Sequence, residues 1–181
     1  METLAEKQTN MFKALKERFG YKSIMQTPKL DKIVISAKVG SMNDKNKVAL
    51  VVDRLAKITG QQPKANPAKK SIATFKLREG TIIGYSVTLR GQRMRNFLDK
   101  LIHVALPRTR DFRGLEVTAI DEMGNYTIGI KEHTIFPETS DEDLRDVFGL
   151  GVTLVTTAKT KEEAEAFLRE IGLPLKKKTA E

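Results

Sequence analysis

The sequence predicts an α+β fold, in which a mostly antiparallel sheet carries helices packed on one face and leaves its opposite face uncovered. Segments with apolar residues at helical spacing are interspersed with short alternating or β-branched segments, without the regular βαβ succession of a parallel sheet. No internal repeat is present, and a chain of 181 residues is long enough to bury one core. We therefore expect residues 1–181 to form a single domain.

The first third of the chain is expected to contain two helices and a strand. Apolar residues at helical spacing predict a helix that ends at Gly20: Leu4, Met11, Phe12, Leu15 and Phe19. Residues 29–39 carry a β-branched run that suits a strand: Ile33, Val34 and Ile35. A second helix is expected to begin after a capping Asn43 or Asp44, to end at Gly60, and to present an apolar face: Val48, Val51, Val52, Leu55 and Ile58.

The middle of the chain breaks this pattern. Residues 61–84 have little apolar periodicity and combine prolines and glycines with basic side chains, which predicts an exposed basic loop. Alternation over residues 85–90 predicts a half-buried strand, with Val87 and Leu89 alternating with Ser86 and Thr88. A third helix is expected after Gly91, closed by Pro107, with these residues inward: Met94, Phe97, Leu98, Leu101 and Ile102.

The last part of the chain is expected to hold two strands and a final helix. Residues 125–130 and 152–157 are predicted strands. Thr160 and Glu163 match a capping box at the start of the helix. The expected buried face of the helix consists of Ala164, Phe167, Leu168 and Ile171. Gly172 and Pro174 are expected to stop the helix.

Charge is distributed unevenly along the chain. Residues 29–115 hold 19 Lys and Arg against six Asp and Glu, whereas residues 116–175 hold five against 13. We distinguish a basic N-terminal half (about residues 1–115), an acidic C-terminal half (about residues 116–175) and a basic tail (residues 176–181). A concentrated basic excess attracts phosphates and releases counterions on binding, which favours a nucleic-acid partner. A solvated surface explains any single lysine equally well.

The composition also indicates a compartment. The sequence has no cysteine, so disulfides and thiolate metal ligands are excluded, and a reducing environment is expected. The N-terminal residues lack the apolar core of a signal peptide, and no later apolar run approaches the length of a membrane span. We therefore expect a soluble, cytoplasmic protein.

The motifs of nucleotide-using and hydrolytic enzymes are incomplete. Residues 20–23 end in the Lys-Ser of a phosphate-binding loop but lack its upstream glycine, so we interpret them as a helix end. Residues 149–151 begin like a dinucleotide fingerprint, but Leu154 replaces the third glycine, so a turn is expected. Residues 84–86 are not a nucleophile elbow, because Thr88 replaces the closing glycine.

No metal site is predicted either. His103 and His133 are far apart in the sequence, no thiol can complete a zinc site, and we interpret both as structural. An acidic cluster lacks the spacing of a calcium loop and is interpreted as a solvated turn: Asp141, Glu142, Asp143 and Asp146. We expect no metal, no cofactor and no catalytic residue, and hence no enzyme.

The basic loop and its flanks have the composition of an RNA-binding surface, and the free face of the sheet is available to the same partner. The cations are Lys69, Lys70, Lys76 and Arg78, with Arg90, Arg93 and Arg95 around the start of the third helix. Phosphate contacts would supply affinity. Other groups would meet unstacked bases or sugar hydroxyls: Gln61, Asn66, Ser71, Phe75 and Thr88. Packing within the loop is an equally good explanation of Phe75.

Nine short motifs occur in one order along the chain. They are Gly60-Gln61, Ala68-Lys69-Lys70-Ser71, Phe75-Lys76-Leu77-Arg78, Val87-Thr88-Leu89-Arg90-Gly91, Leu106-Pro107-Arg108, Arg110-Asp111-Phe112-Arg113-Gly114-Leu115, Gly124-Asn125-Tyr126, Ile135-Phe136-Pro137-Glu138 and Thr156-Thr157-Ala158-Lys159. Each motif is weak alone, but together they resemble the bacterial L-five family of large-subunit ribosomal proteins. The resemblance covers residues 19–174.

The resemblance implies a structural constituent of the large ribosomal subunit that binds 5S ribosomal RNA and helps attach it in the central protuberance. The implied partners are 5S and large-subunit ribosomal RNA, other 5S-binding ribosomal proteins, peptidyl-site tRNA, and the basic small-subunit protein S-thirteen across an intersubunit bridge. We assign 5S binding to the polar and basic residues of the loop and its flanks: Gln61, Lys64, Asn66, Lys69, Lys70, Ser71, Thr88 and Arg90. The loop matching residues 71–83 is implied to approach tRNA through Phe75, Lys76 and Arg78. The acidic half gives a physical reason for contact with S-thirteen.

The sequence departs from the family at two places. An asparagine and an extra glycine are usual in residues 36–40, so no asparagine contact is carried onto Ser36. Asp-Gly-Arg-Gly is usual at residues 121–124, where Met123 replaces the arginine, and we expect this change to weaken a local contact with phosphate or protein. Two alternatives stay open: a free RNA chaperone, which would bind RNA without selectivity for 5S, and a phosphoryl-processing enzyme, which would show metal-dependent turnover.

Overall fold

The chain divides into two compact units. The computed structural model describes residues 4–40, 42, 44–139 and 147–176. Unit 1 is made of residues 1–33, 90–128 and 153–181, and unit 2 of residues 34–89 and 129–152. The boundary between the basic and acidic halves therefore lies inside unit 1, and the single-domain organisation stays a prediction. Within the described residues, no helix is both long and apolar enough to span a bilayer.

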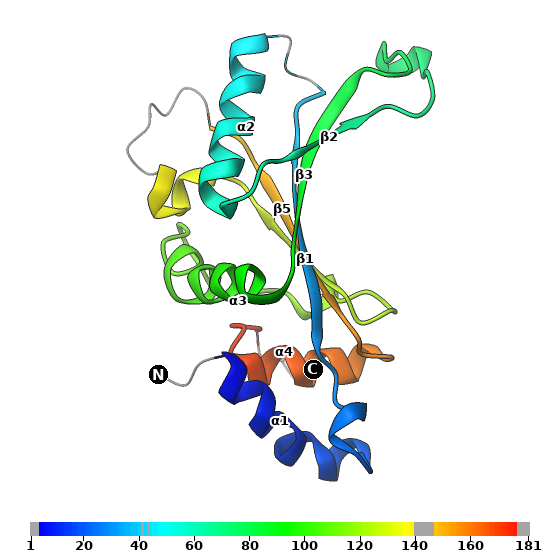
Figure 1. Ribbon diagram of the computed structural model, residues 1–181, viewed down its shortest axis with the longest axis vertical. Helices are drawn as coiled ribbons and strands as arrows, with labels where there is room; N and C mark the ends of the chain where they lie inside the picture. The colour runs from blue at the N-terminus through cyan, green and yellow to red at the C-terminus, as the bar shows by residue number, and fades with distance from the viewer. Residues whose placement is uncertain (1–3, 41, 43, 140–146, 177–181) are drawn as a thin grey trace. The chain divides into compact units, whose positions relative to one another are not determined.

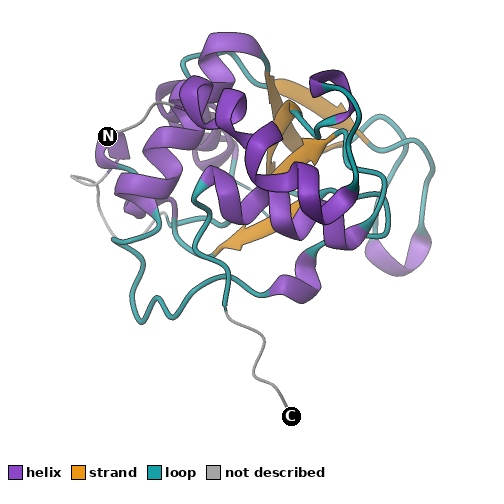
Figure 2. Ribbon diagram, turned by 90° about the horizontal axis from the view of Figure 1, so that it is seen from below, coloured by secondary structure: helices purple, strands orange, loops and turns teal. Residues whose placement is uncertain are grey.

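Five strands form one antiparallel sheet, drawn in orange in Figure 2. They are β1 (Leu30–Lys38), β2 (Lys64–Pro67), β3 (Ile82–Leu89), β4 (Tyr126–Ile130) and β5 (Leu150–Thr156), in the order β2-β3-β1-β5-β4. Strands β1, β4 and β5 each pass from one unit into the other. The predicted α+β class is confirmed, and the four strands expected from the sequence are all present.

In unit 1, the first and last helices of the chain pack together (Figure 1). Helix α1 (Leu4–Phe19) ends at Gly20, and helix α4 (Lys161–Ile171) ends at Gly172, as predicted. Apolar side chains of both helices are buried: Met11 and Leu15 from α1, and Ala164, Phe167, Leu168 and Ile171 from α4. The apolar periodicity of each segment therefore marks a face that enters the core.

The start of α4 differs in one detail from the predicted capping box. The Thr160 hydroxyl accepts a hydrogen bond from the Glu163 amide at 3.3 Å, as expected. The buried Glu163 carboxylate, however, accepts from the Lys159 amide at 2.8 Å, rather than from Thr160. Its other oxygen accepts from the Tyr21 hydroxyl. Glu163 thus joins the start of α4 to the segment that follows α1.

Helix α3 (Gly91–Lys100) also belongs to unit 1 and continues into a π-helical turn, η3 (Leu101–Ala105). The amide of Leu106 donates to the Leu101 carbonyl at 2.9 Å, which closes this wider turn before Pro107. All five residues predicted to face inward are buried: Met94, Phe97, Leu98, Leu101 and Ile102. The inward face is confirmed, although the change of helix type was not predicted.

In unit 2, helix α2 (Lys45–Thr59) packs against β3. The Asp44 carboxylate caps it by accepting from the Asn46 amide at 2.8 Å, and Gly60 ends it. Asn43, the other candidate for the cap, lies outside the described residues. Of the predicted apolar face, these side chains are fully buried: Val51, Leu55 and Ile58.

The histidines have different environments. His133, in η5 (His133–Ile135) of unit 2, is buried and stacks on Phe148 with ring centroids 4.2 Å apart. Its Nδ1 accepts a hydrogen bond from the Phe148 amide at 3.3 Å, so the structural interpretation of His133 is confirmed. His103 is exposed on η3 of unit 1. In the part of the chain that the structure describes, no cluster of His, Asp and Glu is arranged to hold a metal ion.

Candidate nucleic-acid interface

Residues 61–89 of unit 2, hereafter the arm, are more regular than the sequence predicts. The expected loop contains strand β2, which pairs antiparallel with β3, and the short helix η2 (Ala73–Phe75) at the far end (Figure 1). The prediction of an irregular loop was therefore wrong over residues 64–67 and 82–84. Strand β2 is held by its backbone pairing with β3, and none of its four side chains is fully buried. Its sequence therefore needs no alternation of apolar and polar residues.

The arm presents one polar face. In the β2–β3 register Lys64 lies opposite Ser86 and Asn66 lies opposite Gly84. Residues opposite each other in an antiparallel pair project to the same side, and side chains two positions apart share that side. Lys64, Asn66, Ser86 and Thr88 therefore form a single face, hereafter the polar face.

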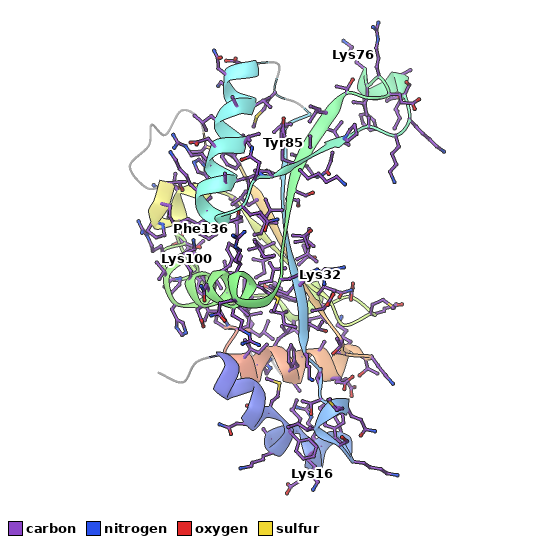
Figure 3. The ribbon with its side chains drawn as sticks, in the orientation of Figure 1. Lys16, Lys32, Lys76, Tyr85, Lys100 and Phe136 are labelled. Carbon is purple, nitrogen blue, oxygen red and sulfur yellow. The ribbon has the colours of Figure 1, made fainter. Side chains whose placement is uncertain are left out.

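Hydrogen bonds hold the polar face in place. The Asn66 amide nitrogen donates to the Ser86 hydroxyl at 3.1 Å, and the Gln61 side chain donates to the Thr88 carbonyl at 3.4 Å. The hydroxyl of Thr88 is on an exposed residue and takes no part in these bonds. Sequence reasoning did not include Ser86 in the site, although its alternation with Val87 was visible. The opposite side of β3 carries Val87, which is buried, and Tyr85, which Figure 3 labels between β3 and α2.

The base of the arm is held close to β1 at Gly84. The amides of Val39 and Gly40 both donate to the Ile83 carbonyl, at 3.0 and 3.1 Å. A Cβ atom added to Gly84 would lie 2.8 Å from the Ala37 carbonyl oxygen. Because no side chain fits at this distance, glycine allows the two backbones to approach. Residues 84–86 lie within β3, so the prediction that the chain continues there as a strand is confirmed.

The tip of the arm is a closed hairpin. Ile72 and Leu77 exchange backbone hydrogen bonds of 3.0 and 3.1 Å across it. Lys76 adopts the left-handed conformation, with φ of 51°, and ends η2. Behind the tip, the Ser71 hydroxyl accepts from the Glu79 amide at 2.9 Å. Ser71, predicted to contact RNA, thus has a hydroxyl that closes the loop.

Aromatic and cationic side chains are exposed at the tip. Phe75 is 75% exposed, so its interpretation as a residue packed within the loop is wrong. Lys76 and Arg78 are exposed as well, and Figure 3 shows Lys76 at the end of the arm. Lys69 and Lys70, between β2 and the tip, are also exposed. The tip therefore combines positive charge with an open ring face, which suits a nucleic acid better than a neutral partner.

The charge of the arm is nearly all of one sign. Residues 61–89 contain five Lys and Arg and a single acidic residue, Glu79. Such a surface attracts phosphates without regard to sequence, and the fixed amide and hydroxyl groups of the polar face add directional hydrogen bonds. The arm thus has the two components needed for selective binding of a nucleic acid.

Arg90 is placed differently from the other predicted site residues. It follows β3, belongs to unit 1 and stands at the N-cap position of α3. Its Nη1 lies 3.1 Å from Oδ1 of Asp31, so one guanidinium donor already meets a carboxylate. The remaining donors of the guanidinium can still bind a phosphate.

Comparison with known proteins gives a consistent result over almost the whole chain. Residues 23–78 match the family described as Ribosomal protein L5, and residues 82–175 match the model of the C-terminus of this same ribosomal family. The large ribosomal subunit protein uL5 of Heliobacterium modesticaldum is 51% identical over 97% of this chain and 99% of its own length. The proteins of the same name from Flavobacterium johnsoniae and Ligilactobacillus salivarius are 50% identical (95% of this chain, 94% of the relative) and 51% identical (96% and 98%).

Proposed function

Because this chain belongs to the ribosomal protein L5 family, we propose that it binds 5S ribosomal RNA through the arm and helps attach it to the large subunit. The family consists of structural ribosomal proteins and not of enzymes. The chain is accordingly a structural constituent of the large subunit and part of the bacterial cytoplasmic ribosome. Ribosomal RNA is its general partner.

The polar face is the observation that carries the 5S proposal. A purely electrostatic surface would need only lysines on mobile loops, whereas here amide and hydroxyl groups are fixed on paired strands beside the cations. Asn66 is held by Ser86, and the strand pairing fixes the position of Thr88. Groups with fixed positions can distinguish one RNA surface from another, because hydrogen bonds depend on geometry. Lys69 and Lys70 supply phosphate contacts nearby, and Arg90 is proposed to supply another.

The tip of the arm is proposed to reach peptidyl-site tRNA. Phe75 offers a ring for stacking, and Lys76 and Arg78 offer charge for the backbone of the tRNA. Replacing Lys76 and Arg78 together by Ala should weaken tRNA retention on ribosomes without preventing incorporation of the protein. A variant with Lys131→Ala and Lys159→Ala, which removes two exposed lysines of the acidic half, is the matched control. Equal retention by both variants would remove the tip from the proposal.

The acidic half is proposed to face the basic small-subunit protein S-thirteen. Residues 116–175 hold 13 acidic against five basic residues, which favours a basic protein partner over RNA. The acidic cluster at residues 141–146 lies outside the described residues. Contacts with other 5S-binding ribosomal proteins are part of the same proposal.

The decisive experiment compares binding to 5S ribosomal RNA and to an unrelated RNA of equal length over a salt series. If ~6 phosphates are neutralised, log affinity should fall with log salt at a slope of about −4 to −5 for both RNAs. Selectivity for 5S should persist at high salt, because hydrogen bonds are screened less than charges. Thr88→Val, which removes a hydroxyl but keeps the shape, should reduce the selectivity. Thr118→Val, at another exposed threonine, should not. Equal affinities for the two RNAs would leave the chaperone interpretation and reject the polar face as a recognition site.

A further inference from the structure

A second exposed surface lies in unit 1, on the short helix η1 (Ile24–Gln26) between α1 and β1 (Figure 1). Ile24 is 50% exposed and Met25 is 77% exposed. Two neighbouring apolar side chains on the outside of a folded unit lose free energy in water, and a partner that covers them recovers it. Neither residue belongs to the arm, which lies in unit 2.

The turn that carries these side chains is held in shape by its own hydrogen bonds. The Gln26 side chain accepts from the Lys22 amide at 2.8 Å, and the Gln26 amide donates to the Ser23 carbonyl at 3.0 Å. The residues on either side, Tyr21 and Thr27, are buried. Met25 therefore projects from a fixed support, and little conformational freedom of the backbone is lost when a partner covers it.

The segments on either side of the turn are rich in positive charge. Residues 10–29 contain one exposed acidic residue, Glu17. The same segment contains five exposed cations: Lys13, Lys16, Arg18, Lys22 and Lys29. The Lys29 ammonium lies 3.8 Å from the Met25 sulfur, and Figure 3 shows Lys16 on the part of α1 that leads into the turn. Within the described ranges, none of the five cations forms an ion pair with a carboxylate.

We propose that η1 is a separate RNA contact, in which Met25 and Ile24 pack against an unpaired, unstacked base and Lys22 and Lys29 neutralise the flanking phosphates. Apolar side chains can pack against or between bases where stacking is interrupted. Cations beside them match the phosphates on either side of such a base. This contact deepens the proposed function, because it depends on the chain being bound to ribosomal RNA. A protein surface is the alternative partner, but the density of cations favours a polyanion.

Photo-crosslinking in assembled large subunits tests the contact directly. A benzophenone amino acid at position 25 should crosslink to ribosomal RNA in subunits purified by sedimentation. The matched control is position 123, a methionine of unit 1 that is 73% exposed but follows Asp121 and Glu122, and it should give no RNA crosslink. A crosslink from position 25 to a protein, or none at all in subunits that contain the variant, would overturn the proposal. The same probe at position 70, an exposed lysine of the arm that is proposed to contact 5S RNA, reports on the arm, so that failure at 25 alone leaves the proposed function standing.

Affinity provides a second measurement with purified large-subunit ribosomal RNA as the probe. Met25→Ala should weaken binding roughly tenfold, since it removes an apolar contact made only in the complex. Replacing both Lys22 and Lys29 by Ala should make the salt slope shallower by about 1.5 to 2, the value for two lost phosphate contacts. Met123→Ala should change neither quantity. Unchanged affinity of the Met25 variant would contradict the inference. If the wild-type protein itself bound no ribosomal RNA, that result would contradict the proposed function.

Discussion

Replacing Gly84 by Ala should separate the arm from the strand that supports it. The added Cβ would lie 2.8 Å from the Ala37 carbonyl oxygen, whereas ordinary carbon–oxygen contacts are about 3.3 Å or longer. Strands β1 and β3 must therefore move apart by roughly 0.5 Å. The two hydrogen bonds that Ile83 accepts would then lengthen from 3.0 and 3.1 Å to the limit of a hydrogen bond.

The expected cost combines overpacking with weakened hydrogen bonds. Overpacking in a close contact costs about 1–3 kcal/mol, and weakening the two hydrogen bonds without breaking them costs about 1 kcal/mol in total, so the free energy of unfolding should fall by about 2–4 kcal/mol. With an m-value of roughly 2 kcal/mol/M, the urea midpoint should fall by about 1–2 M. Affinity for 5S RNA should fall as well, because Ser86 and Thr88 move with β3.

Gly129→Ala is the matched control for this substitution. Gly129 also lies in a strand of unit 2, β4, but no heavy atom lies within 4 Å of a Cβ built there. The free energy of unfolding of this variant should stay within about 1 kcal/mol of the wild type. If the two variants unfold at the same urea concentration, the close approach at Gly84 does not govern the position of the arm.

Three further substitutions test other contacts. Burial, and then the Glu116 carboxylate, raises the pKa of Tyr126 from 10.0 to about 12. Stability that is present below pH 10 should therefore be lost between pH 10 and 12, by up to about 2.7 kcal/mol. Tyr126→Phe should flatten that decline in alkaline denaturation curves, and a decline of the same steepness in the variant would contradict the assignment. Tyr21→Phe should lower the free energy of unfolding by about 1.5–3 kcal/mol, because the buried carboxylate of Glu163 loses a hydrogen-bond donor; a urea midpoint equal to that of the wild type would show that the bond contributes nothing. Ser71→Ala should speed hydrogen exchange at the Glu79 amide, while the free energy of unfolding falls by no more than about 1 kcal/mol. Unchanged exchange at the Glu79 amide would mean that the Ser71 hydroxyl does not close the loop.

Local patterns were sufficient for the helices and the central strands. Apolar spacing identified the buried faces of α1, α2, α3 and α4. Capping residues indicated two of the helix starts: Thr160 for α4, and either Asn43 or Asp44 for α2, where the structure has Asp44 as the cap. These features depend on residues a few positions apart, so the sequence displays them directly. Strand β2 was missed because its existence depends on pairing with a strand about 20 positions away, which leaves no periodic pattern in Lys64–Pro67.

The candidate site was predicted in composition but not in geometry. The cations of the arm and Phe75 are visible in the sequence, and the structure finds them exposed. What the sequence could not show is that Asn66 and Thr88 share one face, since this depends on the register of the hairpin. It also could not show that the Ser71 hydroxyl bonds to the backbone, because a serine in a basic loop serves RNA contact and loop closure equally well.

The route of the chain through unit 1 determines when that unit can fold during synthesis. Unit 1 is built from the first, middle and last segments of the chain, and the hydrogen bond between Tyr21 and Glu163 joins positions 142 residues apart. Helix α1 therefore leaves the ribosome that makes it long before its partner α4 exists. Until then, the apolar face of α1 lacks the surface that α4 provides, and it is open to chaperones and to misassociation. Premature termination after residue 152 but before residue 160 would therefore yield a chain whose unit 1 lacks α4, even though every residue of unit 2 would already have been made.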